Sequence, residues 1–592
     1  MRIVSIEIQN YRNLSGQQAS LHHECNFIVG ENNIGKSNFL NFINVVFTQR
    51  GFNADDFKDL ALPISGKIVL QLEDVEKGIF SDLFDAEDPN KINILLQQQS
   101  PIDNLEFKHE ESLTFIQPSL IRCLNYIHYD SLRNPISEIN FDKGKGVGKF
   151  LTRLVKNYVS TQSDVNLPKK NFINETEVNL LVDSLNDTVG KLKAFNDFGI
   201  KAGVENDLES LLPKMVSLVD INGDSLTRSG YGVQFLILVT LSILDKIQTI
   251  IEQKWRQNAI FEGEEIVAGK TEKVKYISLV LGLDEPEIHL HPYMQRSLIK
   301  YLNRVISNQN QDFNNLLKSL FGIDKFIGQI IVITHSPNII LNDYKQIIRF
   351  HQNSNKVIIK SGNIFQLSPQ DENHLNILFP AIKEAFFSKS VLFVEGETEF
   401  TALPRIASKY DIDFDDLGIA LIKVGGDCIS IVMNIVNRFG IDSVGVQDFD
   451  RGKKAIKNQD PNLFFTSKAN FEDELVDLIK QGRENILREI FLSVEIKYGI
   501  NTIVQLSSLK EINTKFSLGL NNIKDSKLSE LFQTYPITHD EFNLLKCYYL
   551  AWFSNKKGYL VGKIIGDVIP VDCVPEVYKD CIKKVKELSS PI

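Results

Sequence analysis

The sequence predicts an α/β fold in which buried parallel strands alternate with helices. Two apolar runs, at residues 276–283 and 329–334, are each followed by polar residues. This pattern is typical of parallel strands that helices cover on both faces. A glycine-containing strand-loop-helix pattern spans residues 26–43, and this pattern is typical of a phosphate-binding turn. A further short apolar run at residues 389–394 is followed by acids, so we expect a second α/β unit there.

Length and composition indicate a multidomain protein. The chain has 592 residues, of which 43% are hydrophobic, enough for roughly two to four domains of about 150 residues each. The longest apolar stretch, residues 233–244, is shorter than the roughly 20 residues that cross a bilayer. Residues 4–9 alternate like a strand and lack the apolar core of a signal peptide. We therefore expect no membrane span and a cytoplasmic location.

Cysteine spacing and net charge limit the classes further. The six cysteines include no CxxC pair, so neither a disulfide framework nor a zinc knuckle is indicated. The net charge of −10 argues against a surface covered in basic patches. It remains compatible with a local basic stripe that binds nucleic acid.

The loop at residues 30–37 is the first candidate site. Its glycines permit backbone angles that point successive N–H groups at phosphate oxygens. Lys36 can reach the terminal phosphates, and the Ser37 hydroxyl can bind Mg²⁺. The candidate nucleotide-binding residues in this loop are Gly30, Asn33, Gly35, Lys36 and Ser37.

The two longer apolar runs place acids and an imidazole near this loop. Asp284 and Glu285 follow the first run, where Asp284 would hold Mg²⁺ and Glu285 would polarise the attacking water. His335 follows the second run, and the order of the motifs favours a role as a γ-phosphate sensor over a purely structural one.

Together these segments resemble the ATPase head of the ABC superfamily, in its SMC and RecF-like branch. The resemblance rests on the loop at residues 30–37, the strand and turn at 279–292, and the motif at 334–337. Residues 228–234 resemble the signature motif of that branch, although they depart from its usual LSGGQ order.

The resemblance implies an ATPase domain over residues 1–365, with an inserted lobe at about 75–220. In such heads, ATP with Mg²⁺ lies between two protomers, which implies a homo-oligomer, a dimer or a tetramer, formed through the heads. The signature residues of one protomer then face the loop of the other across the γ-phosphate. An Asn-aromatic-Arg segment near the N-terminus also matches the branch and puts Arg12 near the nucleotide, while a solvated surface arginine is the alternative. The candidates from this comparison are Ser229, Gly230, Gly232 and Arg12.

A second chemistry begins after the run at 389–394. Glu395 lies at the carboxyl end of the expected strand and Glu399 on the first turn of the expected helix, so both can face one point. Asp448 and Asp450 follow another strand and share one face by the two-residue period. Their mutual repulsion requires divalent cations or raised pKa values.

This acidic pattern resembles the Toprim domain of topoisomerases, primases, small recombination proteins and OLD nucleases. No zinc module of the primase kind is present, and the residues after the Toprim core leave too little room for a topoisomerase gate. An ABC head followed by Toprim is the architecture of the overcoming lysogenization defect (OLD) family. The resemblance implies a Toprim nuclease domain at 385–592 with a helical C-terminal part.

The family pattern also implies a later acid and a lysine. The acid is Glu472 or Glu474, and the lysine is Lys557 in preference to Lys556. With these residues the site would hold two Mg²⁺ or Mn²⁺ ions about 4 Å apart, one activating water and one stabilising the leaving oxygen, while the lysine neutralises the scissile phosphate. Lys453, Lys454 and Lys457 are further candidates for phosphate contacts, or simply an exposed face.

The expected function is a nucleotide-regulated, metal-dependent DNA endonuclease that nicks DNA or cuts both strands. OLD family members act in bacterial anti-phage defence, and the motifs look most like the Gabija type, with the retron-associated type as the alternative. The expected partners are DNA and either a UvrD-like helicase subunit or a retron reverse transcriptase with its RNA. Two other functions stay open: an ATP-driven DNA-binding clamp of the SMC or RecF kind, and a Toprim transesterase.

Overall fold

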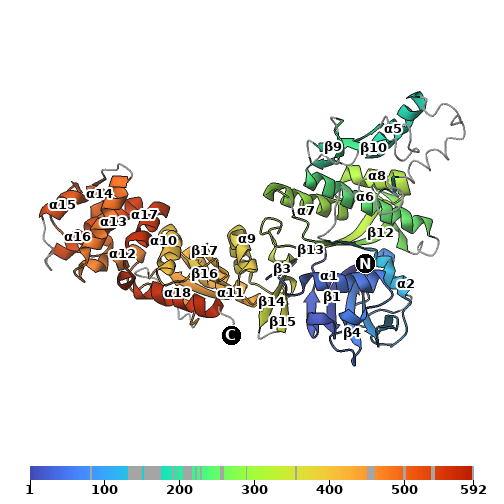
Figure 1. Cartoon of the computed structure of the whole chain (residues 1–592), viewed down its shortest axis with the longest axis horizontal. Helices are drawn as coiled ribbons and strands as arrows, with labels where there is room; N and C mark the ends of the chain where they lie inside the picture. The colour runs from blue at the N-terminus through green and yellow to red at the C-terminus, as the bar shows by residue number, and fades with distance from the viewer. Residues whose placement is uncertain are drawn as a thin grey trace. The chain divides into compact units, whose positions relative to one another are not determined.

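The chain forms two compact units, Met1–Phe365 and Gln366–Ile592 (Figure 1). Each unit contains a sheet with parallel neighbouring strands, which confirms the expected α/β class. The structure is a computed structural model and describes residues 1–80, 83–130, 148, 150–151, 175–189, 193–195, 198–204, 216–220, 223–226, 230–253, 259–267, 269–288, 290–353, 356–449, 460–497, 502–534 and 541–589.

Unit 1 begins with an antiparallel sheet. Its strand order is β2-β1-β4-β5-β6. In β1, Ile3, Ile6 and Ile8 are buried while their neighbours are more exposed, the alternation of a sheet with one covered face. The strands are β1 (Arg2–Gln9), β2 (Gln17–Ser20), β4 (Ile64–Gln71), β5 (Lys91–Gln98) and β6 (Glu106–His109).

The second sheet of unit 1 carries the nucleotide motifs. Its order is β11-β12-β13-β3-β14-β15, and β7 also pairs with β12. The neighbours among β7, β12, β13, β3 and β14 run parallel, so their carboxyl ends meet at one edge. The strands are β3 (Cys25–Gly30), β7 (Tyr126–Tyr129), β11 (Ile260–Val267), β12 (Lys270–Asp284), β13 (Lys325–Ile333), β14 (Ile347–Asn353) and β15 (Lys356–Ser361).

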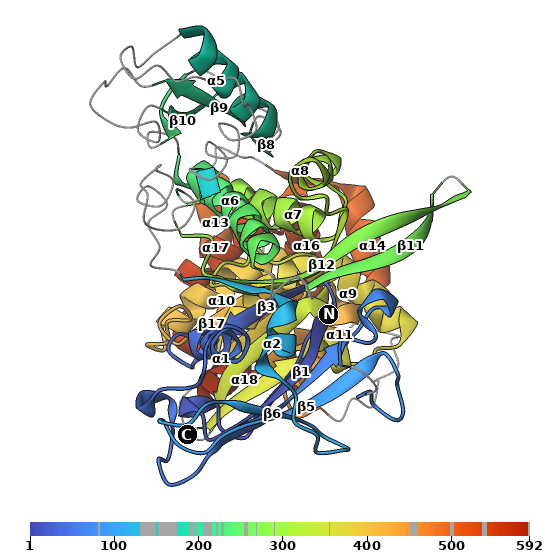
Figure 2. The same ribbon diagram turned by 90° about the vertical axis from the view of Figure 1, so that its right-hand side faces the viewer.

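Strand β12 has two different halves. Its first residues are mostly exposed and pair antiparallel with β11, whereas residues 277–284 are all buried. Figure 2 shows the β11–β12 ribbon projecting from the rest of unit 1. The buried half is the apolar run predicted from the sequence, and it ends at Asp284.

The helices of unit 1 include α6, the longest apolar helix. By length and composition residues 232–252 could cross a membrane, yet 72% of its apolar window is buried within the protein. It packs against α7 and α8 (Figure 1), as the core helix of a globular domain does. The remaining elements are α1 (Lys36–Thr48), α2 (Pro118–Ile121), α5 (Glu175–Val189), β8 (Lys193–Phe195), β9 (Phe198–Val204), β10 (Val216–Asp220), α6 (Tyr231–Glu252), α7 (Pro292–Ile306) and α8 (Gln311–Phe321).

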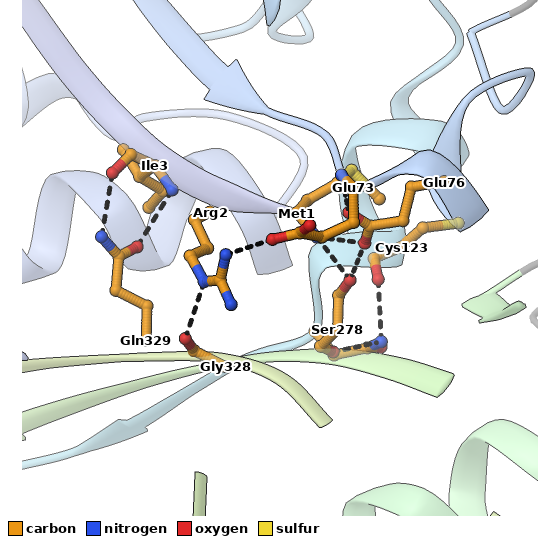
Figure 3. Close-up of polar contacts among 10 residues, drawn as sticks. Met1, Arg2, Ile3, Glu73, Glu76, Cys123, Ser278, Gly328 and Gln329 are labelled. Carbon is orange, nitrogen blue, oxygen red and sulfur yellow. Dashed lines mark hydrogen bonds and ion pairs between the residues drawn. The ribbon is translucent and has the colours of Figure 1, made fainter. Parts of the chain in front are cut away.

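A buried polar cluster fastens β1 to the nucleotide-binding sheet (Figure 3). The Met1 amine donates to Glu76 and, over 2.7 Å, to the Ser278 hydroxyl on β12. The Gln329 amide on β13 exchanges two hydrogen bonds with the backbone of Ile3, at 2.9 and 3.0 Å. Burial lowers the pKa of the Met1 amine to about 6. These contacts satisfy polar groups that would otherwise be buried without partners.

The sheet of unit 2 is entirely parallel, in the order β17-β16-β18-β19. Its central strand β16 is buried throughout, as predicted for the run at 389–394. Helices α11 and α18 pack against the sheet. The elements are α9 (Pro369–Ile382), β16 (Ser390–Val394), α10 (Glu397–Ser408), β17 (Ile419–Lys423), α11 (Ile429–Arg438), β18 (Asp442–Gln447), β19 (Leu463–Phe465) and α18 (Glu576–Ser589).

A helical part completes unit 2. Its centre is α16, on which Tyr549 and Trp552 are buried and hydrogen-bonded to Glu484 and Glu495, at 2.7 and 3.0 Å. The elements are α12 (Phe471–Val476), α13 (Glu484–Lys497), β20 (Ile503–Val504), α14 (Leu506–Lys515), β21 (Ser526–Lys527), α15 (Leu528–Thr534), α16 (Phe542–Lys556) and α17 (Tyr559–Val568).

Candidate functional sites

The loop after β3 has the backbone that phosphate binding requires. Gly30 has a φ of 128°, and a Cβ there would lie 2.0 Å from the carbonyl oxygen of Phe350 on the neighbouring strand. Gly35 has a φ of 95°, and a Cβ there would meet the Asn13 side chain at 2.5 Å. Asn33 adopts a φ of 61°, a conformation that asparagine tolerates better than most residues. Both glycines are therefore needed for this loop shape.

Lys36 is the first residue of α1 and is nearly buried. Its ammonium donates to the carbonyl oxygen of Gly30 over 3.0 Å and to that of Glu31. Burial lowers its pKa to about 8, although the negative charges of Glu285 and Asp284 oppose the shift. The ammonium thus lies at the carboxyl edge of the sheet, near Asp284 and Glu285, which the sequence predicted to belong to the same ATP site.

Asp284 and Ser37 meet at this edge. The Ser37 hydroxyl hydrogen-bonds the Asp284 carboxylate, while burial raises the pKa of that carboxyl to about 6. One carboxylate oxygen, Oδ1, is buried with no hydrogen-bond partner among the described residues. The next residue, Glu285, adopts a φ of 48°, which is uncommon outside glycine and frequent at functional sites.

His335 is held beside Glu285 by a second acid. Its Nε2 lies 3.2 Å from Glu285 Oε1, and its backbone N–H donates to Glu287 Oε1 over 2.6 Å. The Thr334 hydroxyl donates to the same Glu287 oxygen, also over 2.6 Å. Burial and the charge of Lys36 lower the pKa of His335. The structure therefore brings Lys36, Asp284, Glu285 and His335 to one edge, as the motif order predicted.

Arg12 lies beside the first turn of α1. Its guanidinium pairs with Asp56, with nitrogens 2.8 and 2.9 Å from Oδ1, and donates to Asn38 Oδ1 over 2.5 Å. The ion pair shows that Arg12 is not simply a solvated surface arginine, and its role beside the nucleotide stays a prediction. Arg12 braces α1 two residues after Lys36.

The signature segment is described only in part. Ser229 lies outside the described residues, and Gly230 is the exposed residue just before α6. Gly232 lies in the first turn, where a Cβ would meet Leu290 at 2.5 Å and Met294 at 2.8 Å. Close helix packing within unit 1 is therefore sufficient to explain a glycine at position 232.

In unit 2, Glu395 and Asp448 follow the adjacent parallel strands β16 and β18. The Asp448 N–H donates to Glu395 Oε2 over 3.2 Å. A Cβ on Gly426 would lie 2.1 Å from the same Glu395 oxygen, so the carboxylate sits directly over the Gly426 backbone. The two acids thus share one edge of the sheet, as expected from the strand pattern.

Glu399 is the most buried of the predicted acids. It lies on the first turn of α10, only 5% exposed, and its carboxylate turns back over Gly396. Burial raises its pKa well above the usual range, and the charges of Glu472, Asp448 and Glu395 act in the same direction. We call the four carboxylates of Glu395, Glu399, Asp448 and Glu472 the acidic cluster.

The two candidates for the later acid differ in direction. Glu472 is buried, and its Oε1 accepts a hydrogen bond from the Thr398 hydroxyl over 3.2 Å. Glu474 instead accepts from the backbone N–H groups of Ser467 and Lys468. Only Glu472 therefore faces the acidic cluster, while Glu474 stabilises the loop before α12.

Other predicted residues lie at or beyond the rim. Lys557 is exposed at the junction between α16 and α17, and Lys556 is partly buried at the end of α16. Asp450, Lys453, Lys454 and Lys457 lie outside the described residues. Among the residues that are described, no group of three His, Cys, Asp or Glu side chains is close enough to hold an ion. The described acids are therefore neighbours that do not form a complete ion cage by themselves.

Two positioning residues were missed from the sequence. Thr398 is buried, accepts from the Gly558 N–H over 3.3 Å and donates to Glu472, so it joins the turn after Lys557 to the acidic cluster. Glu287 holds the His335 loop. Thr398 lies between the predicted ligands Glu395 and Glu399, and Glu287 follows Asp284 and Glu285. The sequence pattern does not distinguish them from their neighbours, whereas their hydrogen bonds do.

Two models of known protein families match different parts of the chain. A family model described as an AAA ATPase domain matches residues 1–127 and 153–340, more than half of the chain. A second, described as the TOPRIM domain of overcoming lysogenization defect protein-like proteins, matches residues 386–450. The chain belongs to the OLD family.

Named relatives of this OLD family chain are nucleases. The chain is 22% identical over 490 residues to "Endonuclease GajA" of Bacillus cereus strain VD045, covering 77% of each protein. It is 23% identical over 417 residues to "Old nuclease" of Escherichia phage P2, covering 68% of this chain and 60% of that protein. A solved Smc head bound to the winged-helix domain of ScpA is 14% identical, covers 63% of this chain and 99% of that chain, and has a TM-score of 0.36.

Proposed function

We propose that this OLD family protein is a nucleotide-regulated, divalent-metal-dependent DNA endonuclease. The observation that carries the proposal is the burial of Glu399 beside Glu395, Asp448 and Glu472 at the carboxyl edge of the unit 2 sheet. Glu399 and Glu472 are buried, and neighbouring carboxylates that lose contact with water are costly to ionise without a positive partner. The nuclease names of the two relatives agree with this reading.

The donor set suits Mg²⁺ or Mn²⁺. The ligands would be Glu395, Glu399, Asp448 and Glu472, with Asp450 as a further one, and hard divalent cations prefer such oxygen ligands. When bound, two such ions activate water and stabilise the leaving oxygen in phosphodiester hydrolysis. The chain itself orients Glu472 through Thr398 and Glu395 through the Asp448 N–H. The exposed Lys557 would bind the phosphate of the DNA strand.

The residues at the carboxyl edge of the unit 1 sheet suit ATP with Mg²⁺. The orphaned oxygen Oδ1 of Asp284 and the Ser37 hydroxyl are the oxygen donors, and Lys36 would bind the terminal phosphates. Glu285, paired with His335, is the group that would orient water, with His335 reading the γ-phosphate. Association of two heads around nucleotide would make the protein a homo-oligomer, a dimer or a tetramer.

We further propose that nucleotide binding restrains or licenses cleavage and does not drive translocation. The experiment is an ATP titration of DNA cleavage in Mg²⁺ or Mn²⁺, with wild type and Lys36→Ala. The wild-type rate should change with ATP, and the Lys36→Ala rate should not. Equal indifference of both proteins to ATP would contradict regulation without touching the nuclease assignment.

The biological role proposed is that of an effector in bacterial anti-phage defence, acting in the cytoplasm. The relatives that support this proposal are the proteins named "Endonuclease GajA" and "Old nuclease". A UvrD-like helicase subunit is the partner expected for the Gabija type, and a reverse transcriptase with its RNA for the retron type. Co-purification from cells that carry the neighbouring genes separates these two.

The nuclease assignment is tested with purified protein, supercoiled plasmid and linear DNA, with and without divalent metal and ATP. Metal-dependent conversion of the plasmid to nicked or linear forms is expected. DNA binding without cleavage under every condition would favour the clamp alternative.

One observation favours a transesterase as the second candidate. Tyr559 is 55% exposed at the start of α17 and lies edge-to-face with Phe400, the residue after Glu399 on α10. A phenol so placed could attack the phosphate in place of water. Quenching the reaction with detergent distinguishes the two: a protein–DNA adduct lost in Tyr559→Phe indicates transesterification, and its absence indicates hydrolysis.

A further inference from the structure

A buried tyrosine lies behind the acidic cluster. Tyr578, in the first turn of α18, is fully buried, and its hydroxyl has no hydrogen-bond partner among the described residues. Helix α18 packs against β16 and β18, the strands that precede Glu395 and Asp448. The C-terminal helix therefore delivers a polar atom to the interior side of the site.

The surroundings of Tyr578 place its hydroxyl near the acids. Its ring packs edge-to-face on Phe471, with centroids 4.7 Å apart, and Phe471 is the residue before Glu472. The charges of Glu399, Asp448 and Glu472 all act on the phenol, the first of these most strongly. Burial and these charges raise its pKa well above the usual range, so the hydroxyl keeps its proton and remains a donor.

A packing role does not account for the oxygen. A phenylalanine would fill the same space without burying an unpaired hydroxyl, which native proteins generally avoid. The acids whose charges act on this phenol are Glu399, Asp448 and Glu472, all members of the acidic cluster. Carboxylates that hold metal ions are usually supported by a hydrogen bond from a neighbouring group.

We propose that Tyr578 is a positioning residue of the metal site, whose hydroxyl donates a hydrogen bond to Glu399 when the acidic cluster holds divalent cations. This inference rests on the proposed nuclease function. It assigns to the C-terminal helix a direct part in arranging the site, through a group that neither touches DNA nor binds metal.

The test is thermal unfolding of full-length Tyr578→Phe, in EDTA and over a Mn²⁺ titration, with isothermal measurement of Mn²⁺ binding. In EDTA the variant should melt no lower than wild type, because it loses only an unpaired hydroxyl. Its half-saturating Mn²⁺ concentration should rise by about 10-fold or more, the usual effect of removing such support. An unchanged Mn²⁺ midpoint would overturn the proposal.

Tyr549→Phe is the matched control. Tyr549 is equally buried, but its hydroxyl donates to Glu484 over 2.7 Å within the helical part. Its loss should lower the melting temperature in EDTA and leave the Mn²⁺ midpoint unchanged. A midpoint shifted equally in both variants would show a general effect of the helical core and count against the proposal.

A second arm ties the effect to Glu399. In a Glu399→Ala background, Tyr578→Phe should have much less effect on Mn²⁺ binding than in wild type, since the acceptor is removed. Full additivity of the two changes would contradict the pairing. If the wild-type protein neither binds Mn²⁺ nor cuts DNA, the proposed nuclease function fails. If the wild type does both and Tyr578→Phe behaves identically, only the role of Tyr578 is contradicted.

Discussion

Gly562 of α17 lies against the backbone of Thr398 in α10: a Cβ at position 562 would come 2.3 Å from the Thr398 carbonyl oxygen. One turn later, a Cβ on Gly566 would lie 2.9 Å from the carbonyl oxygen of Ala402. Two glycines therefore let α17 approach α10 closely, as small residues do at tight helix crossings. Helix α10 carries Glu399 and the start of α17 follows Lys557, so this crossing fixes the turn at Lys557 relative to the helix that carries Glu399.

Gly562→Ala should disturb both stability and cleavage. The added methyl group meets backbone and not a flexible side chain, so the helices must move apart, at a cost of about 1–3 kcal/mol. Chemical denaturation measures that loss, and the cleavage rate should fall with it. Gly425→Ala is the control, because nothing lies within 4 Å of a Cβ there. Equal stability of the two variants would contradict the tight crossing.

Thr398→Val should disconnect the turn after Lys557 from Glu472. Valine keeps the shape but loses the hydroxyl that accepts from the Gly558 N–H and donates to Glu472. Leaving those groups unpaired should lower the free energy of unfolding by about 1–3 kcal/mol and reduce the cleavage rate. Thr398→Ser, which retains the hydroxyl, should restore most of both. Comparable defects in the two variants would indicate that the methyl group matters and the hydroxyl does not.

Glu472→Gln and Glu474→Gln resolve the register of the later acid. Since only Glu472 lies in the acidic cluster, its substitution should reduce metal-dependent cleavage by about 100-fold or more. Glu474→Gln should mainly weaken the hydrogen bonds to the loop at Ser467 and Lys468, and so affect stability more than metal affinity. Rates and Mn²⁺ midpoints measured in parallel decide the point, and the reverse order of effects would move the ligand to Glu474.

Acid should weaken unit 1 through His351. This side chain on β14 is buried, and burial, helped by Arg349 and Lys360, lowers its pKa to about 4. Below its ordinary pKa of about 6.5 the unfolded chain takes up a proton that the folded chain does not. The associated stability is therefore present above about pH 6.5 and is lost as the pH falls toward 4, by about 3 kcal/mol.

Unfolding measured between pH 7 and 4 checks this expectation. His351→Gln cannot titrate at this position, so its stability should fall less steeply with falling pH than that of wild type. Because Phe350 on β14 pairs with Gly30, ATP binding should weaken over the same pH range. Parallel slopes for His351→Gln and wild type would contradict the assignment.

The strands and the sites at their ends were predictable from the sequence. The runs that end at Asp284 and Val394, and the strand before Asp448, are buried parallel strands. A short continuous apolar run between turns is typical of a strand that is covered on both faces. The parallel arrangement then brings their acids to one edge. Features set by the local sequence, such as a buried strand and the acid at its end, can therefore be predicted from the sequence.

The remaining features depend on contacts between distant segments. The direction of Glu472 is set by Thr398, 74 positions earlier, and no spacing rule separates it from Glu474. Tyr578 reaches the cluster only because α18 returns to the sheet, and the bracing of α1 by Arg12 through Asp56 depends on how a later loop folds. Such pairings follow from tertiary packing, which periodicity does not encode.

The most direct test of the nuclease site compares Glu399→Gln with Glu397→Gln in a Mn²⁺-dependent plasmid cleavage assay. Both acids lie in the same turn, but Glu399 is buried in the acidic cluster, whereas Glu397 is exposed and pairs with Lys423 at 2.8 Å. Glu399→Gln should lower the cleavage rate by about 100-fold or more, and Glu397→Gln should cut at close to the wild-type rate. Equal rates for wild type, Glu399→Gln and Glu397→Gln would contradict the central claim.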